Sequence, residues 1–504
     1  MSHPYAAELA DIFRHLLPEM ALVAIACALF LGGLFKADRL LWGGVALGAL
    51  VLALILLHVP IEKQLLSGQA LYAVPMLSDG LAHFTREIAC FAGILLILIS
   101  WNDMPERQVA DHHACLLVIV AGVGLVGCSN DLVTLFLSLE MVSIPTYIML
   151  YLPRNDEASQ EAALKYFLLS IFSSALLLFG FSYLYGMTGT TNIAGILNVM
   201  RLASSEEMKS TAGLAQVAML TIAAGIGFRI TAVPFHFYAP DVFQGTSTSG
   251  AAFLSYIPKL AGFIALVRVF GIVTPGQDVP EAAPPGITLS DQMPTLFWFL
   301  AAMTMAVGNI LGLLQDNLKR LMAYSSIGHA GYMLVAVASA PYLSPAESPT
   351  LGVPALLFYL IAYGTMTLGF FAMLAMLDRP ERPVETVDDL AGLAKSHPAV
   401  ALMVTALMLS LIGFPLTVGF TGKFQIFFGA ISVQGTAAWL YPTLALIGMV
   451  TAAIGAWYYL RIITVMYLRS SVRPIETPGA LASWTALIAC VVLTFLLSIF
   501  PIRA

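Results

Sequence analysis

The stretches GIGFRITAVPFHFYAPDVFQG at residues 225–245 and LIGFPLTVGFTGKFQIFFG at residues 411–429 decide the fold of this chain. Each is a mostly apolar run that contains the pattern I-G-F-x-x-T, one lysine or arginine, and residues that disfavour a continuous helix. Proline removes a backbone donor and glycine costs conformational entropy, so both runs are predicted to be broken helices. The residues predicted to interrupt them are Pro234, Pro240, Gly413, Pro415, Gly419 and Gly422.

The two interrupted runs lie far apart in the sequence yet share their pattern, which is typical of a transporter built from two inverted repeats. In such proteins irregular backbone occurs at membrane depth only where it is buried in protein or lines a water-filled cavity. Arg229 stands beside the first break and Lys423 beside the second. The alternative is two unrelated proline kinks, which are common in membrane helices.

The composition identifies the class of protein. Of the 504 residues, 59% are hydrophobic and only 10% are charged, whereas an average soluble domain is about 25% charged. This excludes a soluble enzyme and a disordered chain, and a net charge of −6 offers no basic surface for nucleic acid. The five cysteines form no C-x-x-C pair, so we expect no zinc, iron–sulfur or haem site and no bound metal.

The remaining class is an all-α polytopic membrane protein. A membrane-spanning helix needs about 20 mostly apolar residues, and by that criterion the chain holds about fourteen spans. An open sheet cannot satisfy its backbone in lipid, and no alternating ten-residue pattern suggests a barrel. The predicted spans are residues 17–35, 40–58, 82–100, 114–130, 132–151, 163–186, 211–234, 250–273, 294–315, 320–340, 353–377, 397–418, 439–467 and 480–501.

The stretch TPGQDVPEAAPPGITLSDQM at residues 274–293 is rich in proline and glycine, and we predict an irregular loop there that divides the chain into halves. An even number of spans places both termini on one side of the membrane. Most lysines and arginines of the connecting loops then fall on the opposite side, and basic loops stay in the cytoplasm. Both termini are therefore predicted to face the periplasm.

Several charged residues fall inside the predicted spans, where a charge costs about 2.5–3.5 kcal/mol. Arg86, Arg268 and Arg461 lie toward span ends, and we expect them to reach the interface. Lys165 follows Glu161 by one helical turn, so a solvated ion pair explains it as well as a functional role does. The charges far from any interface are expected to be functional, and they are Glu140, Arg229, Lys259 and Lys423.

Two histidines inside apolar segments complete the candidate set. His236 follows the first break, and His329 lies in an apolar span with Tyr324 and Ser325 close by in the sequence. Their position among other titratable groups indicates a proton relay. The alternative is that each histidine is a hydrogen-bonded packing residue, as is common in membrane helices.

The residue types favour protons as the transported species. A lysine in an apolar site can bind and release a proton near neutral pH, whereas arginine stays charged. Arg229 is therefore expected to act as a fixed countercharge. A carrier of metal cations would need cages of carboxylate and carbonyl oxygens, and acidic residues are scarce in the predicted spans.

Five segments of the chain carry a family resemblance: SLEMVSIPTYIML (138–150), EAALKYFLLS (161–170), residues 225–245, NLKRLMAYSSIGHAGYM (317–333) and GFPLTVGFTGKF (413–424). In this order they resemble the antiporter-like membrane subunits of respiratory complex I, most closely those of the subunit N type. The resemblance covers nearly the whole chain.

The resemblance implies a fold of about fourteen helices with two inverted five-helix repeats, each with one broken helix. The matching division of the chain is residues 1–113 for the N-terminal helices, 114–273 for the first repeat (broken near 234–240), 274–293 for the linker, 294–467 for the second repeat (broken near 413–422) and 468–504 for the last helix.

The resemblance also implies roles for individual residues. Glu140 matches the family's acidic residue of the first channel, and Lys165 matches a lysine on the following helix. Lys259 matches the lysine on the central axis, and His329 matches the histidine between the two halves. Lys423 matches the lysine of the second broken helix, which opens toward the periplasmic side. Together these residues would form the proton path.

The sequence departs from the family pattern at Arg229, where relatives usually have a lysine paired with the acid. An arginine there is not expected to release a proton. The first half-channel would then rely on Lys165 and Lys259. Residues 246–250 also differ from relatives, which commonly carry Ala-Pro in this stretch.

Further expectations concern the chain's surroundings. The resemblance implies that this chain binds no cofactor, and that NADH, FMN, the iron–sulfur clusters and most of the quinone site belong to other subunits. Its partners would be a second antiporter-like subunit and small membrane subunits in the bacterial inner membrane. The alternative function is the proton-conducting subunit of a multi-subunit cation/proton antiporter or of a membrane-bound hydrogenase, which share the same core.

Overall fold

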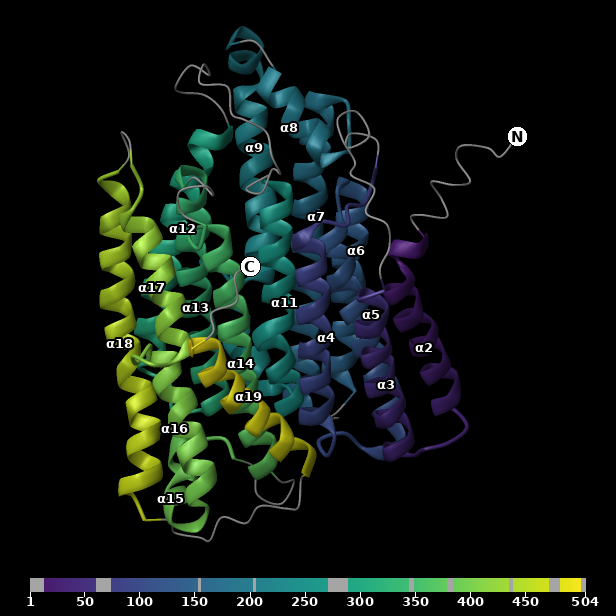
Figure 1. Cartoon of the computed structure of the whole chain (residues 1–504), viewed down its shortest axis with the longest axis vertical. Coiled ribbons are helices and arrows are strands. Elements are labelled where there is room, and N and C mark those ends of the chain that lie inside the picture. The colour runs from purple at the N-terminus through teal and green to yellow at the C-terminus, as the bar shows by residue number, and fades with distance from the viewer. Residues whose placement is uncertain are drawn as a thin grey trace.

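The computed structural model describes residues 13–59, 74–152, 156–202, 205–270, 289–343, 349–378, 384–434, 438–470 and 481–499. Within these ranges the chain is a bundle of helices that stand side by side, and no strand is present among them (Figure 1). The first part of the bundle consists of α2 (Leu17–Gly33), α3 (Arg39–Leu57), α4 (Gly80–Ser100), α5 (Val109–Cys128), α6 (Leu132–Tyr151), α7 (Glu157–Thr188), α8 (Ile193–Leu202), α9 (Ser205–Arg229), α10 (Ala239–Gly245) and α11 (Thr248–Val269).

The second part of the bundle follows after a stretch outside the described residues. It consists of α12 (Leu289–Gly312), α13 (Leu318–Ser339), α14 (Val353–Leu377), α15 (Leu393–Ser396), α16 (Pro398–Ile412), α17 (Val418–Ile431), α18 (Leu440–Leu468) and α19 (Leu481–Ile499). Within the described ranges, three single turns of 3-10 helix join longer elements, at Glu106–Gln108, Ala340–Tyr342 and Val387–Leu390.

Every span predicted from the sequence overlaps one of these helices, which confirms the all-helical membrane fold. Among the described residues, eleven helices are long and apolar enough to cross a membrane, and α2, α16, α17 and the apolar part of α9 are shorter. Helix α17 is the second part of the run at residues 411–429 that was predicted to be a broken helix, although the predicted span ended at residue 418. The predicted linker, 274–293, lies outside the described residues except for its last residues, which belong to α12.

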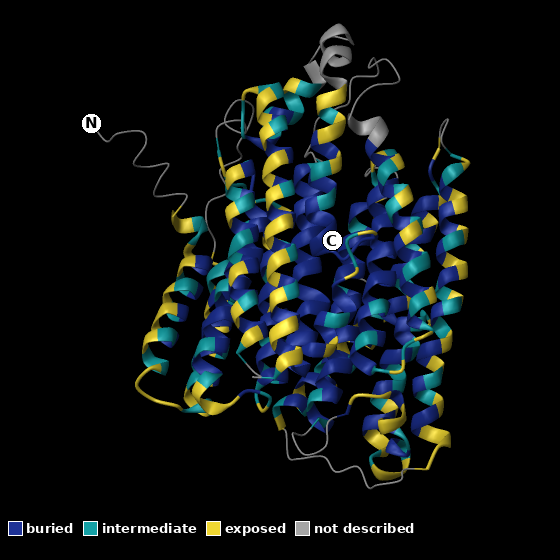
Figure 2. Ribbon diagram, turned by 180° about the vertical axis from the view of Figure 1, so that it is seen from behind, coloured by how far each residue is buried: buried dark blue, intermediate teal, exposed yellow. Residues whose placement is uncertain are grey.

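The core of the bundle is formed by helices that are apolar on all sides. Helix α11 is buried along its whole length, and α13, α14 and α5 are buried over most of theirs. Figure 2 shows these buried helices in the middle of the bundle, with exposed residues on the surrounding ones. A helix that is hydrophobic all round belongs inside a large protein or a membrane. The few polar side chains on the central helices are therefore surrounded by other helices of the bundle.

The first break separates α9, which ends at Arg229, from α10, which begins at Ala239. The backbone groups freed there find partners in the protein. The carbonyl of Phe228 accepts a hydrogen bond from the Tyr238 hydroxyl at 2.9 Å. Pro234 lies between the two helices, whereas Pro240 lies in the first turn of α10. The backbone N–H groups of a first turn have no partner within the helix, so proline removes no helical hydrogen bond there.

The second break separates α16 from α17 and contains Pro415. Gly413 caps α16 with a φ of +93°, a conformation that favours glycine. Gly419 and Gly422 were predicted to interrupt the helix, and that prediction is wrong, since both lie inside α17. Their lack of a side chain serves packing instead, because a Cβ on Gly422 would lie 2.4 Å from the Tyr359 ring.

Candidate functional site

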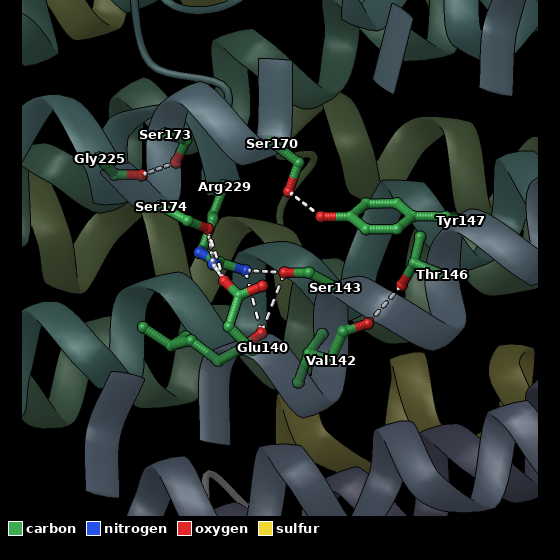
Figure 3. Close-up of polar contacts among 11 residues, drawn as sticks. Glu140, Val142, Ser143, Thr146, Tyr147, Ser170, Ser173, Ser174, Gly225 and Arg229 are labelled. Atoms are coloured by element: carbon green, nitrogen blue, oxygen red, sulfur yellow. Dashed lines mark hydrogen bonds and ion pairs between the residues drawn. The ribbon is translucent and has the colours of Figure 1, made fainter. Parts of the chain in front are cut away.

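The first polar site in the interior joins α6 to the end of α9. The Arg229 guanidinium lies 3.0 Å from the Glu140 carboxylate, and the Glu140 side chain is only 20% exposed. Ser174 of α7 donates a hydrogen bond to the same carboxylate at 2.5 Å. Figure 3 shows Glu140 and Arg229 facing one another between the helices. Two of the predicted functional charges are therefore a direct ion pair.

Arg229 is held by more than the ion pair. It donates to the Leu139 carbonyl at 3.2 Å and to the Ser143 hydroxyl, both on α6 (Figure 3). Such additional bonds are what a buried charge needs to offset its lost hydration. Arginine presents several donors in a rigid fork and stays protonated in proteins. The cation at this position is thus fixed in place and in charge.

Helix α11 passes directly beside this ion pair. A Cβ added to Gly262 would lie 3.4 Å from the Arg229 Cβ and 2.5 Å from an Ile230 methyl group, so glycine permits the close approach. Lys259 precedes Gly262 by one helical turn, and residues three apart share a helix face. Lys259 therefore lies on the side of α11 that approaches the end of α9.

Lys259 is fully buried in the centre of the bundle. Its Nζ donates a hydrogen bond to the Ser326 hydroxyl of α13 at 3.1 Å. No carboxylate lies within ion-pair distance of it among the described residues. A buried lysine held by a neutral hydroxyl can exist as ammonium or as amine, because losing its proton leaves no unpaired counterion.

His329 is the centre of a hydroxyl-rich cluster next to Lys259. Its Nδ1 lies 2.7 Å from the Tyr359 hydroxyl of α14, and its Nε2 lies 3.1 Å from the Tyr459 hydroxyl of α18. Tyr459 also bonds Ser325, the residue next to Ser326. Ser325 and His329, predicted from the sequence as relay candidates, are thus brought together with Lys259 by α13.

Lys423 of α17 lies at the second break. Its Nζ donates to the carbonyls of Leu411 at 2.7 Å and Ile412 at 3.1 Å, which are the last residues of α16. The last carbonyls of a helix lack partners within the helix and attract cations. The Lys423 ammonium also lies 4.9 Å from the centre of the Tyr332 ring, which adds a cation–π contact. Lys423 therefore caps a broken helix, and no carboxylate of the described residues pairs with it.

Lys165 lies apart from these sites, near the beginning of α7. Its Nζ contacts Glu161 at 2.7 Å and Asp241 of α10 at 2.9 Å, and its side chain is 39% exposed. Arg320 of α13 contacts the other oxygen of Asp241 at 2.7 Å. Lys165 forms the expected solvated pair with Glu161, which supports a structural role. It also contacts α10, the short helix after the first break, which supports a functional role.

Two other relay candidates lie outside the clusters. His236 lies in the first break, half-buried, and its buried Nδ1 has no hydrogen-bond partner among the described residues. Tyr324 is half-buried on α13 and makes no hydrogen bond with the part of the chain that the structure describes. The structure does not bring either residue into contact with Lys259 or Lys423.

The arginines near span ends differ from expectation. Arg86 and Arg268 were predicted to reach the interface, and that prediction is wrong, since both are buried. Arg86 pairs with Glu19 of α2 at 2.6 Å, and Arg268 bonds Asp79 at 2.6 Å and the Gly127 carbonyl. Partners far away in the sequence made these burials favourable. Arg461, by contrast, is 35% exposed and pairs with an exposed acid.

The tyrosines around His329 were not predicted from the sequence. Tyr359 and Tyr459 contact His329, and Tyr458 donates to the Asn309 amide at 3.2 Å, which in turn donates to Tyr332 at 3.1 Å. A polar ring inside an apolar span is ambiguous in a sequence, because tyrosine also packs as a hydrophobic side chain. The adjacent pair Tyr458 and Tyr459, in the middle of a span and far from either interface, was the available signal.

Comparisons with known proteins show to which family the chain belongs. The family described as "NADH:quinone oxidoreductase/Mrp antiporter, TM" matches residues 129–455. NADH-quinone oxidoreductase subunit N 1 of Solibacter usitatus is 36% identical over 491 residues, which cover 96% of this chain and 94% of that protein.

Solved structures show the same relationship. A chain of respiratory complex I from Thermus thermophilus is 28% identical, with a TM-score of 0.76, and the match covers 96% of this chain and 97% of that one. A chain of the Mrp complex from Dietzia sp. is 20% identical, with a TM-score of 0.74 over 95% of this chain and 50% of that one, which shows a shared fold. This chain therefore belongs to the family of antiporter-like membrane subunits of NADH:quinone oxidoreductases and Mrp antiporters.

Proposed function

We propose that this chain is the proton-translocating subunit N of a membrane-bound NADH:quinone oxidoreductase. In this proposal electron transfer takes place in other subunits, and this chain moves protons through its buried polar groups. The observation that carries the proposal is a row of buried polar groups on and around α13. Lys259 bonds Ser326, and the adjacent residue Ser325 bonds Tyr459, which bonds His329. The row lies between α18 and the apolar, largely buried helices α11 and α13.

The row supplies the groups that proton transfer requires. Lysine, histidine, serine and tyrosine can each give up one proton and accept another, and neighbours within hydrogen-bond distance can pass it on. From His329 the row continues to Tyr359, which packs against Gly422 next to Lys423. Two steps have no direct hydrogen bond, one between Ser326 and Ser325 and one between Tyr359 and Lys423. We assign both to intervening water molecules.

The Glu140–Arg229 pair has a different role in this proposal. Arg229 does not release its proton, so it acts as the fixed countercharge of Glu140. A change in the position of Glu140 relative to Arg229 would alter the electrostatic potential at Lys259, one helix away. We propose that Lys165, Asp241 and Arg320 form a second, more exposed cluster of this proton path at the short helix α10.

The proposal also covers the surroundings of the chain. NADH, FMN, the iron–sulfur clusters and quinone are bound by other subunits of the complex. The chain packs beside a second antiporter-like subunit and small membrane subunits in the bacterial inner membrane, with both termini on the periplasmic side. The two halves, 114–273 and 294–467, act as inverted repeats, each with one broken helix.

The experiment that tests the function is NADH-driven proton pumping in inverted membrane vesicles, followed with a pH-sensitive dye. Lys259→Ala should abolish most of the pumping. Lys395→Ala is the matched control, because Lys395 is exposed in α15. Lys259→Arg should also fail, since arginine retains the charge but not the exchangeable proton. Full pumping by an assembled Lys259→Ala complex would contradict the proposal.

Subunit composition separates the proposal from its alternative. The Mrp structure shares the fold, so a fold alone does not distinguish an oxidoreductase subunit from an antiporter subunit. Affinity purification of the tagged chain should recover subunits that oxidise NADH and reduce quinone. Recovery of other antiporter subunits without NADH oxidation would favour the alternative.

A further inference from the structure

Three side chains with metal-ligating atoms meet where the end of α3 lies beside the beginning of α4. They are His58, the residue that caps α3, and His83 and Glu87 on one face of α4. Their ligand atoms all lie within 4.8 Å of one another. No bound metal was expected from the sequence, because the cysteines form no C-x-x-C pair. Two imidazoles and one carboxylate are nevertheless a ligand set that zinc uses.

The distances within this cluster match those of a metal site. The His58 Nε2 lies 3.3 Å from the Glu87 Oε1, and the His83 Nε2 lies 3.1 Å from the same oxygen. Two ligands bound about 2.0–2.1 Å from a tetrahedral zinc ion lie about 3.3 Å apart. Only small side-chain movements would therefore be needed to place an ion between the three groups.

The hydrogen bonding of His58 is a second, independent observation. Its Nδ1 lies 2.9 Å from the Leu54 carbonyl, which can only accept, so this nitrogen carries a hydrogen. In the neutral ring the Nε2 then carries a lone pair, which faces the carboxylate oxygen of Glu87. Two acceptors at 3.3 Å repel unless a cation lies between them. Metal-ligating histidines typically have their other nitrogen bound to a carbonyl in this way.

We propose that His58, His83 and Glu87 bind a divalent transition-metal ion of the zinc class. Two nitrogen ligands disfavour magnesium and calcium, which prefer oxygen. The three side chains are 63%, 46% and 32% exposed, so the ion is reached from outside and a water molecule fills its fourth position. The bound ion links α3 to α4, and α4 packs against the buried helices α5, α11 and α14. This site is separate from the buried polar row and does not depend on its function.

The competing explanation is that a proton, not a metal, lies between His58 and Glu87. A protonated His58 would form an ordinary ion pair with the carboxylate. The two explanations differ in their response to a chelator, because EDTA removes a bound metal ion but not a proton.

The experiment measures zinc in the purified complex. The complex is treated with EDTA, equilibrated with ZnCl₂ at pH 7.5, freed of excess metal and analysed by mass spectrometry. Wild type and the control His397→Ala should hold one zinc ion more per complex than His83→Ala and the double variant His58→Ala/His83→Ala. Equal zinc contents in wild type and the double variant would overturn the proposal and support the proton.

A second variant and a second measurement guard against misfolding. Glu87→Gln keeps the size of the side chain and both histidines, and it should bind zinc at least about ten-fold more weakly. Cryo-electron microscopy of the wild-type complex, with zinc and after EDTA, should show density between the three side chains only with zinc. Absence of that density in the zinc-treated complex would overturn the proposal without reference to any variant.

Discussion

Two regions of the interior bury their cations in different ways. At the first break, Arg229 lies 3.0 Å from the Glu140 carboxylate and donates further bonds to α6. Lys259 and Lys423, one in each half of the chain, contact hydroxyl groups, helix-end carbonyls and a tyrosine ring, with no carboxylate at ion-pair distance among the described residues. The first arrangement keeps the arginine charged, and the second allows a lysine to lose and regain its proton.

One fold can therefore hold both a permanently charged group and groups that exchange a proton. An ion pair offsets the cost of burial only while both partners remain charged. Dipoles such as the end of α16 stabilise a cation more weakly but leave no isolated counterion when the proton departs. Substitutions of the paired cation and of the cations without a carboxylate partner test this difference.

The largest effect is expected for Arg229→Ala. Removing one partner of a buried ion pair leaves Glu140 unpaired and should lower the free energy of unfolding by about 3–5 kcal/mol. Thermal unfolding of the solubilised complex measures this loss. Arg461→Ala, which breaks an exposed pair with Asp316, is the control and should cost about 0–1 kcal/mol. Equal losses in the two variants would show that the Glu140 pair is not fixed by burial.

The next effect is expected for Lys423→Met, which gives an unbranched side chain only one atom shorter but removes the exchangeable proton. The proton-pumping rate should fall about 100-fold, as is usual when a proton-transfer group is lost. Assembly should be nearly unchanged, because no counterion is left behind. If assembly collapses while the pumping rate per assembled complex is normal, then Lys423 serves mainly to cap α16.

A smaller effect is expected for Tyr359→Phe. This change removes one of the two hydroxyl partners of His329 and should cost about 0.5–1.5 kcal/mol, a several-fold reduction in pumping. Tyr166→Phe is the matched control, since the buried Tyr166 hydroxyl makes no hydrogen bond within the described part of the chain. The pumping assay in vesicles compares the two variants. A Tyr359 variant that pumps as fast as the control would remove this hydroxyl from the row.

The smallest effect is expected for Lys165→Ala if the residue only forms a surface pair. Its contacts with Glu161 and Asp241 are partly exposed, so the free energy of unfolding should change by about 0–1 kcal/mol. Pumping measured in the same variant decides its role. Unchanged pumping leaves Lys165 as a solvated ion pair, whereas a large loss would extend the proton path to α10.

Much of the fold was predictable because membrane helices have a strong local signal. Each predicted span overlaps a helix, and both breaks lie where proline and glycine interrupt apolar runs. The error at Gly419 and Gly422 has a physical reason. A glycine in a helix interior costs only about 1 kcal/mol relative to alanine, and close contact with Ser410 and Tyr359 makes small residues necessary there.

The candidate site was predictable in its charges but not in their partners. Glu140, Arg229, Lys259 and Lys423 stand out in the sequence because charge is rare in an apolar span. Nothing in the sequence indicates that Arg86 would meet Glu19, 67 residues away, or that His329 would meet Tyr459, 130 residues away. Such pairs are made by helix packing and carry no local pattern.

The sequence by itself determined that this chain is a membrane-embedded helical bundle with two broken helices and costly internal charges, because hydropathy, proline and charge act locally along the chain. Only the tertiary structure decided which charges are neutralised and which remain without a counterion. That choice depends on which helices pack side by side, since the energy of a buried charge is set by the groups within a few ångströms of it.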